Sequence, residues 1–201
     1  MLQPSGMDAM ILPPMVEWSH WIIKRVLQPG DVGFDATVGN GNDLVMMASL
    51  VGEQGLVIGC DVQEHAIENA KTRAAQQGLS DRVRLYVESH VNIDRICADA
   101  CITQLRAIMF NLGYLPGGEK SIHTNRETTI AALRKSLELL APGGVMTIVA
   151  YRGHVHGAEE TRDVLAWCND LPVTQFEVVQ CSSPLIERAP IGIAIARRII
   201  Q

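Results

Sequence analysis

Residues 35–43 read Asp-Ala-Thr-Val-Gly-Asn-Gly-Asn-Asp, and this stretch decides the fold class. A short apolar run over residues 32–37 predicts a strand leading into it, and the apolar spacing over residues 43–51 predicts a helix after it. A strand that passes through a glycine-rich turn into a helix is the opening unit of a doubly wound α/β sheet. Ligands of such sheets bind at the carboxyl ends of the strands, so this turn is the first candidate site.

The rest of the chain repeats the alternation of strand and helix. Helices are predicted over residues 64–77, 93–100, 124–140 and 157–169, and strands over residues 56–60, 83–87, 107–111, 145–151, 176–180 and 191–197. Alternating elements imply right-handed crossovers and a mainly parallel sheet. The last two strands have only a loop between them, so we expect them to pair antiparallel.

The helix that follows Thr124 has the clearest sequence signals. Thr124 and Glu127 have the spacing of a capping box, in which each side chain binds a free amide at the helix start. An apolar stripe then runs along one face of the helix, through Ile130, Leu133, Leu137 and Leu140. We expect the Pro-Gly-Gly sequence of residues 142–144 to end the helix.

Composition indicates one globular domain in a reducing compartment. The chain has 201 residues, of which 47% are hydrophobic and 19% charged. We assign residues 1–15 to an irregular lead and residues 16–201 to a single domain. The N-terminus lacks the pattern of a secretory signal, and no apolar run reaches the ~18 residues that cross a bilayer, so we expect no membrane partner. The five cysteines form no CxxC pair, which favours a cytoplasmic location and packing roles over a metal site.

Three ligands compete for the glycine-rich turn. A dinucleotide site requires a third glycine where Leu44 stands, and a phosphate-binding loop of the Walker type requires a Gly-Lys-Ser/Thr sequence that the chain lacks. S-adenosylmethionine is the remaining alternative, because it carries no phosphate and its ammonium and carboxylate groups need polar and acidic partners. The residues that would bind it here are Asp35, Gly39, Asn40, Gly41 and Asp43.

A second acidic position follows the next predicted strand. Asp61 ends that strand, where a carboxylate can accept both hydroxyl groups of a ribose, and Gln63 can add a hydrogen bond. The alternative for Asp61 is an N-cap of the helix that follows. Ser89 and His90 come after the third strand, near the expected place of an adenine, although His90 is equally an ordinary hydrogen-bonded loop residue.

The fourth strand ends in Asn111-Leu-Gly-Tyr114-Leu-Pro-Gly-Gly118, where a methyl acceptor would lie. The spacing of Asn111 and Tyr114 resembles the Asn/Asp-Pro-Pro-Tyr/Phe signature of amino-group methyltransferases. In that signature the Asn accepts hydrogen bonds from the target nitrogen, and the aromatic ring stacks on the base. Both residues are therefore candidate catalytic residues, and the alternative is a turn residue and a core aromatic.

Further residues around this edge are candidates for contact with the substrate. Gly113 lies inside the Asn111–Tyr114 motif, and basic or polar side chains follow in the next loops. They are Lys120, His123, Arg126, Arg152 and His154. Because His154 and His156 alternate in an extended segment, we expect no metal site there.

Four sequence strings resemble one family of small bacterial rRNA methylases, and the resemblance covers residues 18–199. The strings are DATVGNGND (35–43), GCDVQEHAI (59–67), ESH (88–90) and NLGYLPGG (111–118). Members of the family act as tRNA wobble-uridine methyltransferases, which convert 5-aminomethyl-2-thiouridine to its 5-methylaminomethyl form. The resemblance implies a seven-stranded methyltransferase sheet, an amine target and cofactor contacts at Asn40, Asp43, Asp61, Gln63, Ser89 and His90.

The favoured function is therefore methylation of RNA, with the wobble uridine of tRNA as the target. A net charge of −5 argues against a broad basic groove and fits a substrate held by a few local contacts, and we expect no DNA partner. One alternative is a methyltransferase that acts on rRNA, a small molecule or a protein, and a second is a non-catalytic RNA-binding module. For the oligomeric state, a homodimer is one option.

Overall fold

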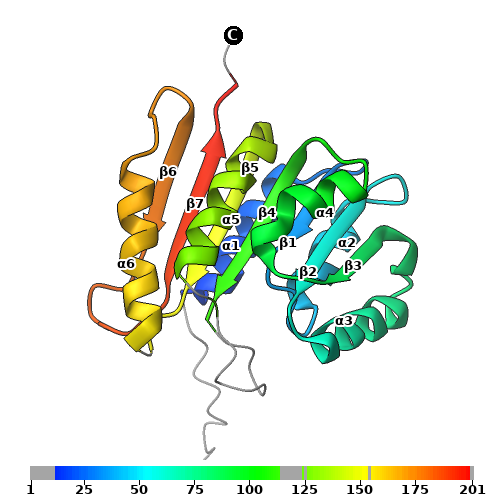
Figure 1. Cartoon of the computed structure of the whole chain (residues 1–201), viewed down its shortest axis with the longest axis horizontal. Helices are drawn as coiled ribbons and strands as arrows, with labels where there is room; N and C mark the ends of the chain where they lie inside the picture. Colours follow the sequence, from blue (N-terminus) through cyan, green and yellow to red (C-terminus); the bar gives the residue numbers. More distant parts are fainter. Residues whose placement is uncertain (1–11, 114–123, 125, 154, 200–201) are drawn as a thin grey trace, which may run out of the picture.

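The structure is a computed structural model that describes residues 12–113, 124, 126–153 and 155–199. Seven strands in these residues form one sheet in the order β3-β2-β1-β4-β5-β7-β6 (Figure 1). The strands are β1 (Val32–Asp35), β2 (Leu56–Asp61), β3 (Val83–Val87), β4 (Leu105–Leu112), β5 (Leu140–Ala150), β6 (Phe176–Cys181) and β7 (Ile191–Arg197). This arrangement confirms the predicted doubly wound α/β class.

The pairing of the strands also follows the prediction. β1 pairs in parallel with β2 on one side and β4 on the other, and β3 and β5 extend the parallel part. β7 pairs antiparallel with both β5 and β6, and its arrow in Figure 1 points opposite to that of β4. The strand order reverses between β1 and β4, which is the switch point where ligands of open α/β sheets bind.

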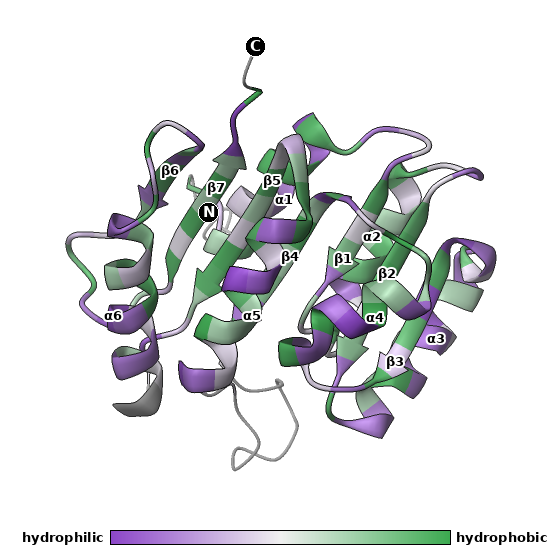
Figure 2. Cartoon of the chain, turned by 45° about the horizontal axis from the view of Figure 1, so that its top comes forward, coloured by the Kyte–Doolittle hydropathy of each residue, from purple (hydrophilic) through white to green (hydrophobic). Residues whose placement is uncertain are grey.

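Helices cover both faces of the sheet (Figures 1 and 2). α1 (Met15–Val26), α2 (Asn42–Leu50) and α3 (Glu64–Gln76) contribute to the apolar cluster on one face. α4 (Ile93–Asp99), α5 (Arg126–Leu139) and α6 (Val155–Asn169) contribute to the cluster on the other face. Two short 3-10 helices, η1 (Ser80–Arg82) and η2 (His90–Asn92), flank β3. In the described residues, every helix is too short or too polar to span a bilayer.

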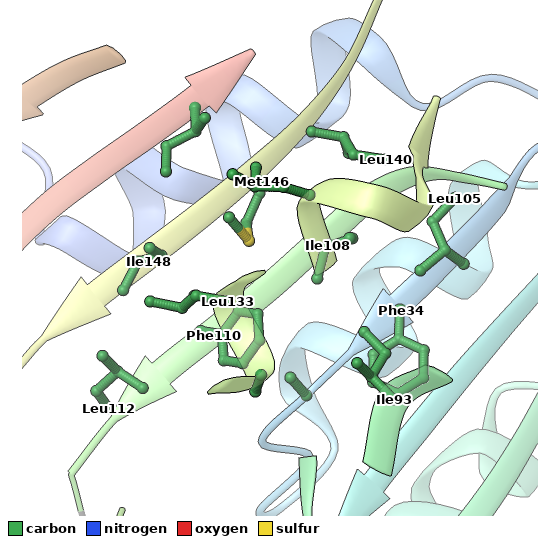
Figure 3. Close-up of a cluster of buried hydrophobic side chains, with 14 of the residues drawn as sticks. Phe34, Ile93, Leu105, Ile108, Phe110, Leu112, Leu133, Leu140, Met146 and Ile148 are labelled. Atoms are coloured by element: carbon green, nitrogen blue, oxygen red, sulfur yellow. The ribbon is translucent and has the colours of Figure 1, made fainter. Parts of the chain in front are cut away.

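Alternation along the central strands produces these two clusters. On β4, Ile108 and Phe110 face α4 and α5, whereas Ala107 and Met109 belong to the opposite cluster. Figure 3 shows Phe110 and Ile108 with Leu133 of α5 and Phe34 of β1. Both faces of the central strands are buried, which explains why β4 reads as an almost continuous apolar run.

Three features differ from the sequence-based expectations. The helix α1 begins at Met15, the last residue of the region assigned to an irregular lead, and had not been predicted. Helix α5 begins at Arg126, and the Thr124 hydroxyl donates to Glu160 of α6 at 2.7 Å, so Thr124 anchors the chain to α6 where a capping box was expected. β5 already begins at Leu140, which pairs with Leu105, and the register then shifts, because residues 141–144 of β5 lie between this pair and the next one, Ala107 with Val145.

Candidate functional site

A cavity of about 1340 Å³ lies at the carboxyl ends of the parallel strands. Its wall is formed by the segments that follow β1 to β5 and by the first part of α1. These segments contribute residues 36–40, 61–63, 88–90, 111, 113, 151 and 153, together with residues 14, 16, 17 and 20. Typical ligand pockets enclose roughly 300–1,000 Å³. The cavity therefore has room for a nucleoside cofactor and part of a second substrate.

The glycine-rich turn is built by two glycines with different tasks. Gly39 lines the cavity, and its amide donates to Asp61 Oδ2 at 2.9 Å. Gly41 is not part of the cavity wall: it adopts a φ of +77°, and a Cβ atom there would lie 2.8 Å from Ala70 of α3. Gly41 therefore has a packing role, because it lets α3 approach the turn, and its predicted contact with the cofactor stays a prediction.

Asp61 lines the cavity and does not occupy the N-cap position of α3. Its Oδ1 accepts a hydrogen bond of 3.0 Å from the amide of Gln63, and Gln63 itself occupies the N-cap position of α3. Each carboxylate oxygen has a second lone pair, and Asp61 lines the cavity. Two backbone amides therefore orient this side chain and leave acceptor capacity for a diol.

Asp35 lies beneath the turn and not in the cavity wall. It is fully buried, and its Oδ1 accepts from the amide of Thr37 at 3.1 Å. Burial, followed by the nearby charge of Asp43, raises the pKa of Asp35 well above its ordinary value. Asp35 therefore supports the turn from the interior of the protein, and its predicted direct contact with the cofactor stays a prediction.

Asn111, Asp43 and His20 form one hydrogen-bonded chain at the other side of the cavity. The Asn111 Nδ2 donates to Asp43 Oδ2, and Asp43 Oδ1 lies 2.5 Å from His20 Nε2. All three residues line the cavity. The Asn111 backbone amide also donates to Thr37 Oγ1 at 2.7 Å, which ties β4 to the turn after β1. The Asn111 Oδ1 atom is buried and has no hydrogen-bond partner among the described residues.

Neutral polar groups gather where the segments after β2 and β3 meet. His90 is 9% exposed, and burial lowers its pKa to about 4, so the ring is neutral at pH 7. The ring contacts Phe110 edge-on, with 5.9 Å between the centroids. His90 Nε2 and Gln63 Oε1 are buried and lack partners among the described residues. Ser89, which lines the cavity with them, accepts from the amide of Val91.

The electrostatics of the cavity suit a nucleoside that carries a sulfonium. Asp43, Asp61 and Glu88 supply carboxylates to its wall, whereas His90 and Gln63 offer neutral hydrogen-bonding groups. Hydrogen bonds from Asn92 and the amide of Ser89 lower the pKa of Glu88 and keep it ionised. Buried polar atoms without partners call for a ligand or water. The residues present therefore fit S-adenosylmethionine.

Tyr151 and His20 are two of the wall residues that the sequence analysis did not identify as site residues. Tyr151 follows β5 and lies against Gly113, where an added Cβ would approach its ring to 3.5 Å. Burial and the charge of Asp43 raise the pKa of Tyr151. Its position at the end of a parallel strand was a usable signal. His20 gave no such signal, because it comes from α1, which lies outside the predicted alternation.

The predicted substrate residues divide into three groups. Gly113 lines the cavity. Arg126 pairs with Asp163 at 2.7 Å, Arg152 donates to the Ala189 carbonyl at 3.0 Å, and neither side chain belongs to the wall. The remaining predicted residues, Tyr114, Lys120, His123 and His154, lie outside the described residues. In the part that is described, no group of three His, Cys, Asp or Glu side chains is placed to hold a metal.

Comparison with known proteins gives consistent similarities over nearly the whole chain. The model of a family described as "Putative rRNA methylase" matches residues 57–196, more than half of the chain. The Arabidopsis thaliana protein "tRNA (mnm(5)s(2)U34)-methyltransferase, chloroplastic" is 35% identical over 192 residues, which are 90% of this chain and 69% of that protein.

Two solved structures share the fold and much of the sequence. A "putative rRNA-methylase" from Clostridium thermocellum superimposes with a TM-score of 0.88 and 40% identity over 94% of this chain and 100% of that one. A "putative methyltransferase" from Streptococcus mutans, solved in complex with SAH, gives a TM-score of 0.81 and 33% identity over 94% of this chain and 99% of that one.

Proposed function

The chain belongs to this rRNA methylase family, and from that premise we propose that it is an RNA methyltransferase whose target is the 5-aminomethyl group of the tRNA wobble uridine. It is an S-adenosylmethionine-dependent methyltransferase. The Asn111 side chain supports an amine as the methyl acceptor. Its nitrogen donates to Asp43, and its oxygen is an acceptor without a partner among the described residues. The name of the plant relative supports the choice of the tRNA wobble position.

The cofactor would be held by the side of the cavity that follows β1 to β3. Asp61 would accept the ribose hydroxyl groups, and the backbone of Gly39 and Asn40 would lie against the methionine part. Gln63, Ser89 and His90 would surround the adenine with neutral groups. The neutral state of His90 at pH 7 suits this place, because a charged ring would be costly so close to Phe110.

The acceptor would lie at Asn111. When bound, the cofactor supplies the methyl group: the amine lone pair forms the new N–C bond, the C–S bond breaks with its electron pair on sulfur, and the product ammonium loses a proton to solvent. Asn111 Oδ1 would accept an N–H of the amine and so aim its lone pair at the methyl group. Catalysis of this kind depends mainly on proximity and alignment. Arg188 and Pro190 line the same cavity and would border the RNA.

Methyl transfer from labelled S-adenosylmethionine tests the proposal directly. The acceptors are bulk tRNA from cells that lack their own wobble methylation step and, separately, rRNA, followed by mass spectrometry of the nucleosides. A new 5-methylaminomethyl-2-thiouridine peak in the tRNA is expected. Label in rRNA alone, or in another tRNA nucleoside, would overturn the wobble-uridine assignment while leaving the methyltransferase activity in place.

A further inference from the structure

We propose that His20 and Asp43 are positioning residues. They hold the Asn111 side chain so that its carbonyl oxygen, and not its nitrogen, faces the amine that receives the methyl group. This inference rests on the proposed amine acceptor and adds two residues to it. His20 comes from α1, Asp43 from the start of α2, and Asn111 from the end of β4. Three separate elements are thus linked at one side of the cavity.

The orientation of Asn111 follows from what Asp43 can bind. An ionised carboxylate only accepts hydrogen bonds, so the group of Asn111 that contacts Asp43 Oδ2 must be its Nδ2. The Asn111 backbone is fixed separately by Thr37 Oγ1. With the nitrogen bound on one side, the side-chain oxygen is the group left without a partner. The reverse orientation would offer N–H donors to the substrate, and these would compete for the lone pair that must attack the methyl group.

His20 holds Asp43 in turn. Its Nε2 lies 2.5 Å from Asp43 Oδ1, with the two side chains 20% and 8% exposed. Donation from His20 leaves Asp43 as an acceptor and fixes its rotamer, since its two oxygens then have separate partners. The helix that carries His20 is itself docked tightly: the Trp18 ring lies 2.7 Å from the place of a Cβ on Gly192 of β7. His20 can therefore not drift away from Asp43 without displacing α1.

Substitutions at His20 separate a hydrogen-bonding role from a packing role. His20→Phe keeps a ring but removes the donor, whereas His20→Gln keeps an N–H that can reach Asp43. We expect kcat on the tRNA to fall about 10- to 100-fold in His20→Phe, because misplacement of a reacting group by ~1 Å costs about this much. We expect His20→Gln to recover most of the loss. Affinity for S-adenosylhomocysteine should stay within about twofold in both variants, because binding of the product nucleoside does not use Asn111.

A double-mutant cycle then tests whether His20 acts through Asn111. Adding His20→Phe to Asn111→Ala should cost little further kcat, because the group that His20 positions is already absent. Asp43→Asn should lose as much as Asn111→Ala, since an amide can offer donors to Asn111 and permits the wrong orientation. Thermal unfolding of each variant checks that it is folded. If His20→Phe does not fold, the comparison of Asp43→Asn with Asn111→Ala tests the inference in its place.

A binding measurement without RNA tests this inference independently of the proposed RNA substrate. Sinefungin carries an amine on carbon where S-adenosylmethionine carries a methyl group on sulfur, so its amine probes the acceptor side of the cavity. Wild-type protein should prefer sinefungin to S-adenosylhomocysteine, and His20→Phe and Asn111→Ala should lose that preference. If wild-type protein methylates no amine, but prefers sinefungin and loses this preference in the two variants, the proposed substrate is wrong and the positioning role of His20 is supported. Unchanged kcat and unchanged preference in His20→Phe, or equal loss of affinity for both ligands, would overturn the inference.

Discussion

The backbone amide of Gly39 donates to the carboxylate of Asp61, 22 residues later in the chain, with 2.9 Å between nitrogen and oxygen. This bond joins the turn after β1 to the end of β2, and the second oxygen of the same carboxylate accepts from the amide of Gln63. The cofactor side of the cavity is therefore assembled around one acidic side chain. Arg73 of α3 adds a second tie by donating to the Asn40 carbonyl at 2.7 Å.

Replacement of Asp61 by Ala should weaken the binding of S-adenosylmethionine about 10- to 100-fold, because hydrogen bonds to a charged group contribute about 1.5–3 kcal/mol. Isothermal titration calorimetry measures the change. The control is Asp81→Ala, which removes the same charge from an exposed position in η1 and should leave the affinity unchanged. Equal affinity of Asp61→Ala and wild-type protein would remove Asp61 from the cofactor site.

Gly41→Ala should lower the free energy of unfolding by more than the strain of a left-handed backbone conformation alone would. A Cβ at Gly41 would lie 2.8 Å from the Cα and Cβ of the fully buried Ala70, whereas Gly78 has nearly the same φ, +67°, and open space around it. Gly78→Ala is thus a matched control that measures the backbone strain alone, about 1–2 kcal/mol. We expect Gly41→Ala to lose a further 1–3 kcal/mol or so by overpacking.

Urea unfolding of both variants provides the comparison. The second substitution Ala70→Gly should return part of the stability to Gly41→Ala, because it removes one of the two Ala70 atoms that the new methyl group meets. Equal losses of stability in Gly41→Ala and Gly78→Ala would show that α3 shifts to accommodate the added methyl group. The close packing of the turn on α3 would then not contribute to stability.

Asn111→Ala should reduce methyl transfer much more than cofactor binding. The side chain is assigned to the acceptor, so its removal misaligns the amine and should lower kcat by about 100-fold. Affinity for S-adenosylmethionine should change less than threefold or so, since the ribose and adenine contacts remain. Single-turnover kinetics and calorimetry measure the two quantities, with the exposed Asn69→Ala as control. Parallel losses in both quantities would mean that Asn111 supports the fold of the cavity only.

The sequence predicts the strands and the glycine turn well because both depend on local patterns. Parallel strands bring their carboxyl ends to one edge, so Asp61, His90 and Asn111 could be placed together before the structure was known. The direction of a side chain at that edge was harder to predict. Asp35 and Asp43 read alike in the sequence, yet the first is the last residue of β1 and faces the interior, whereas the second lies in the first turn of α2 and lines the cavity.

The contribution of α1 could not be predicted for a different reason. Its packing partners are β4, β5, β7 and α2, which come later in the chain, so the place of His20 is set by tertiary contacts alone. Thr124 gives a similar example, because its hydroxyl binds a carboxylate of α6, 36 residues away, and not the helix that it precedes. Local spacing carries no information about either contact.

Acid should destabilise the protein through His90. The folded state holds this ring neutral, with a pKa of about 4 against an ordinary value of 6.5, because the side chain is buried. Between these two values the unfolded chain binds more protons than the folded one, so the free energy of unfolding falls as the pH falls through the window. From about pH 7.5 to about pH 5, His90 alone should lower it by roughly 2 kcal/mol.

His90→Gln isolates this contribution, because the amide is neutral throughout the window and all other titrating groups are retained. Urea unfolding without cofactor, at several pH values between 4 and 8, should give a shallower loss of stability below pH 6.5 for the variant than for wild-type protein. The two curves should run parallel above that pH, where the ring is neutral in both states. Parallel curves over the whole range would mean that His90 binds a proton in the folded state as readily as in the unfolded chain. The ring would then be charged in mild acid, next to the proposed position of the adenine.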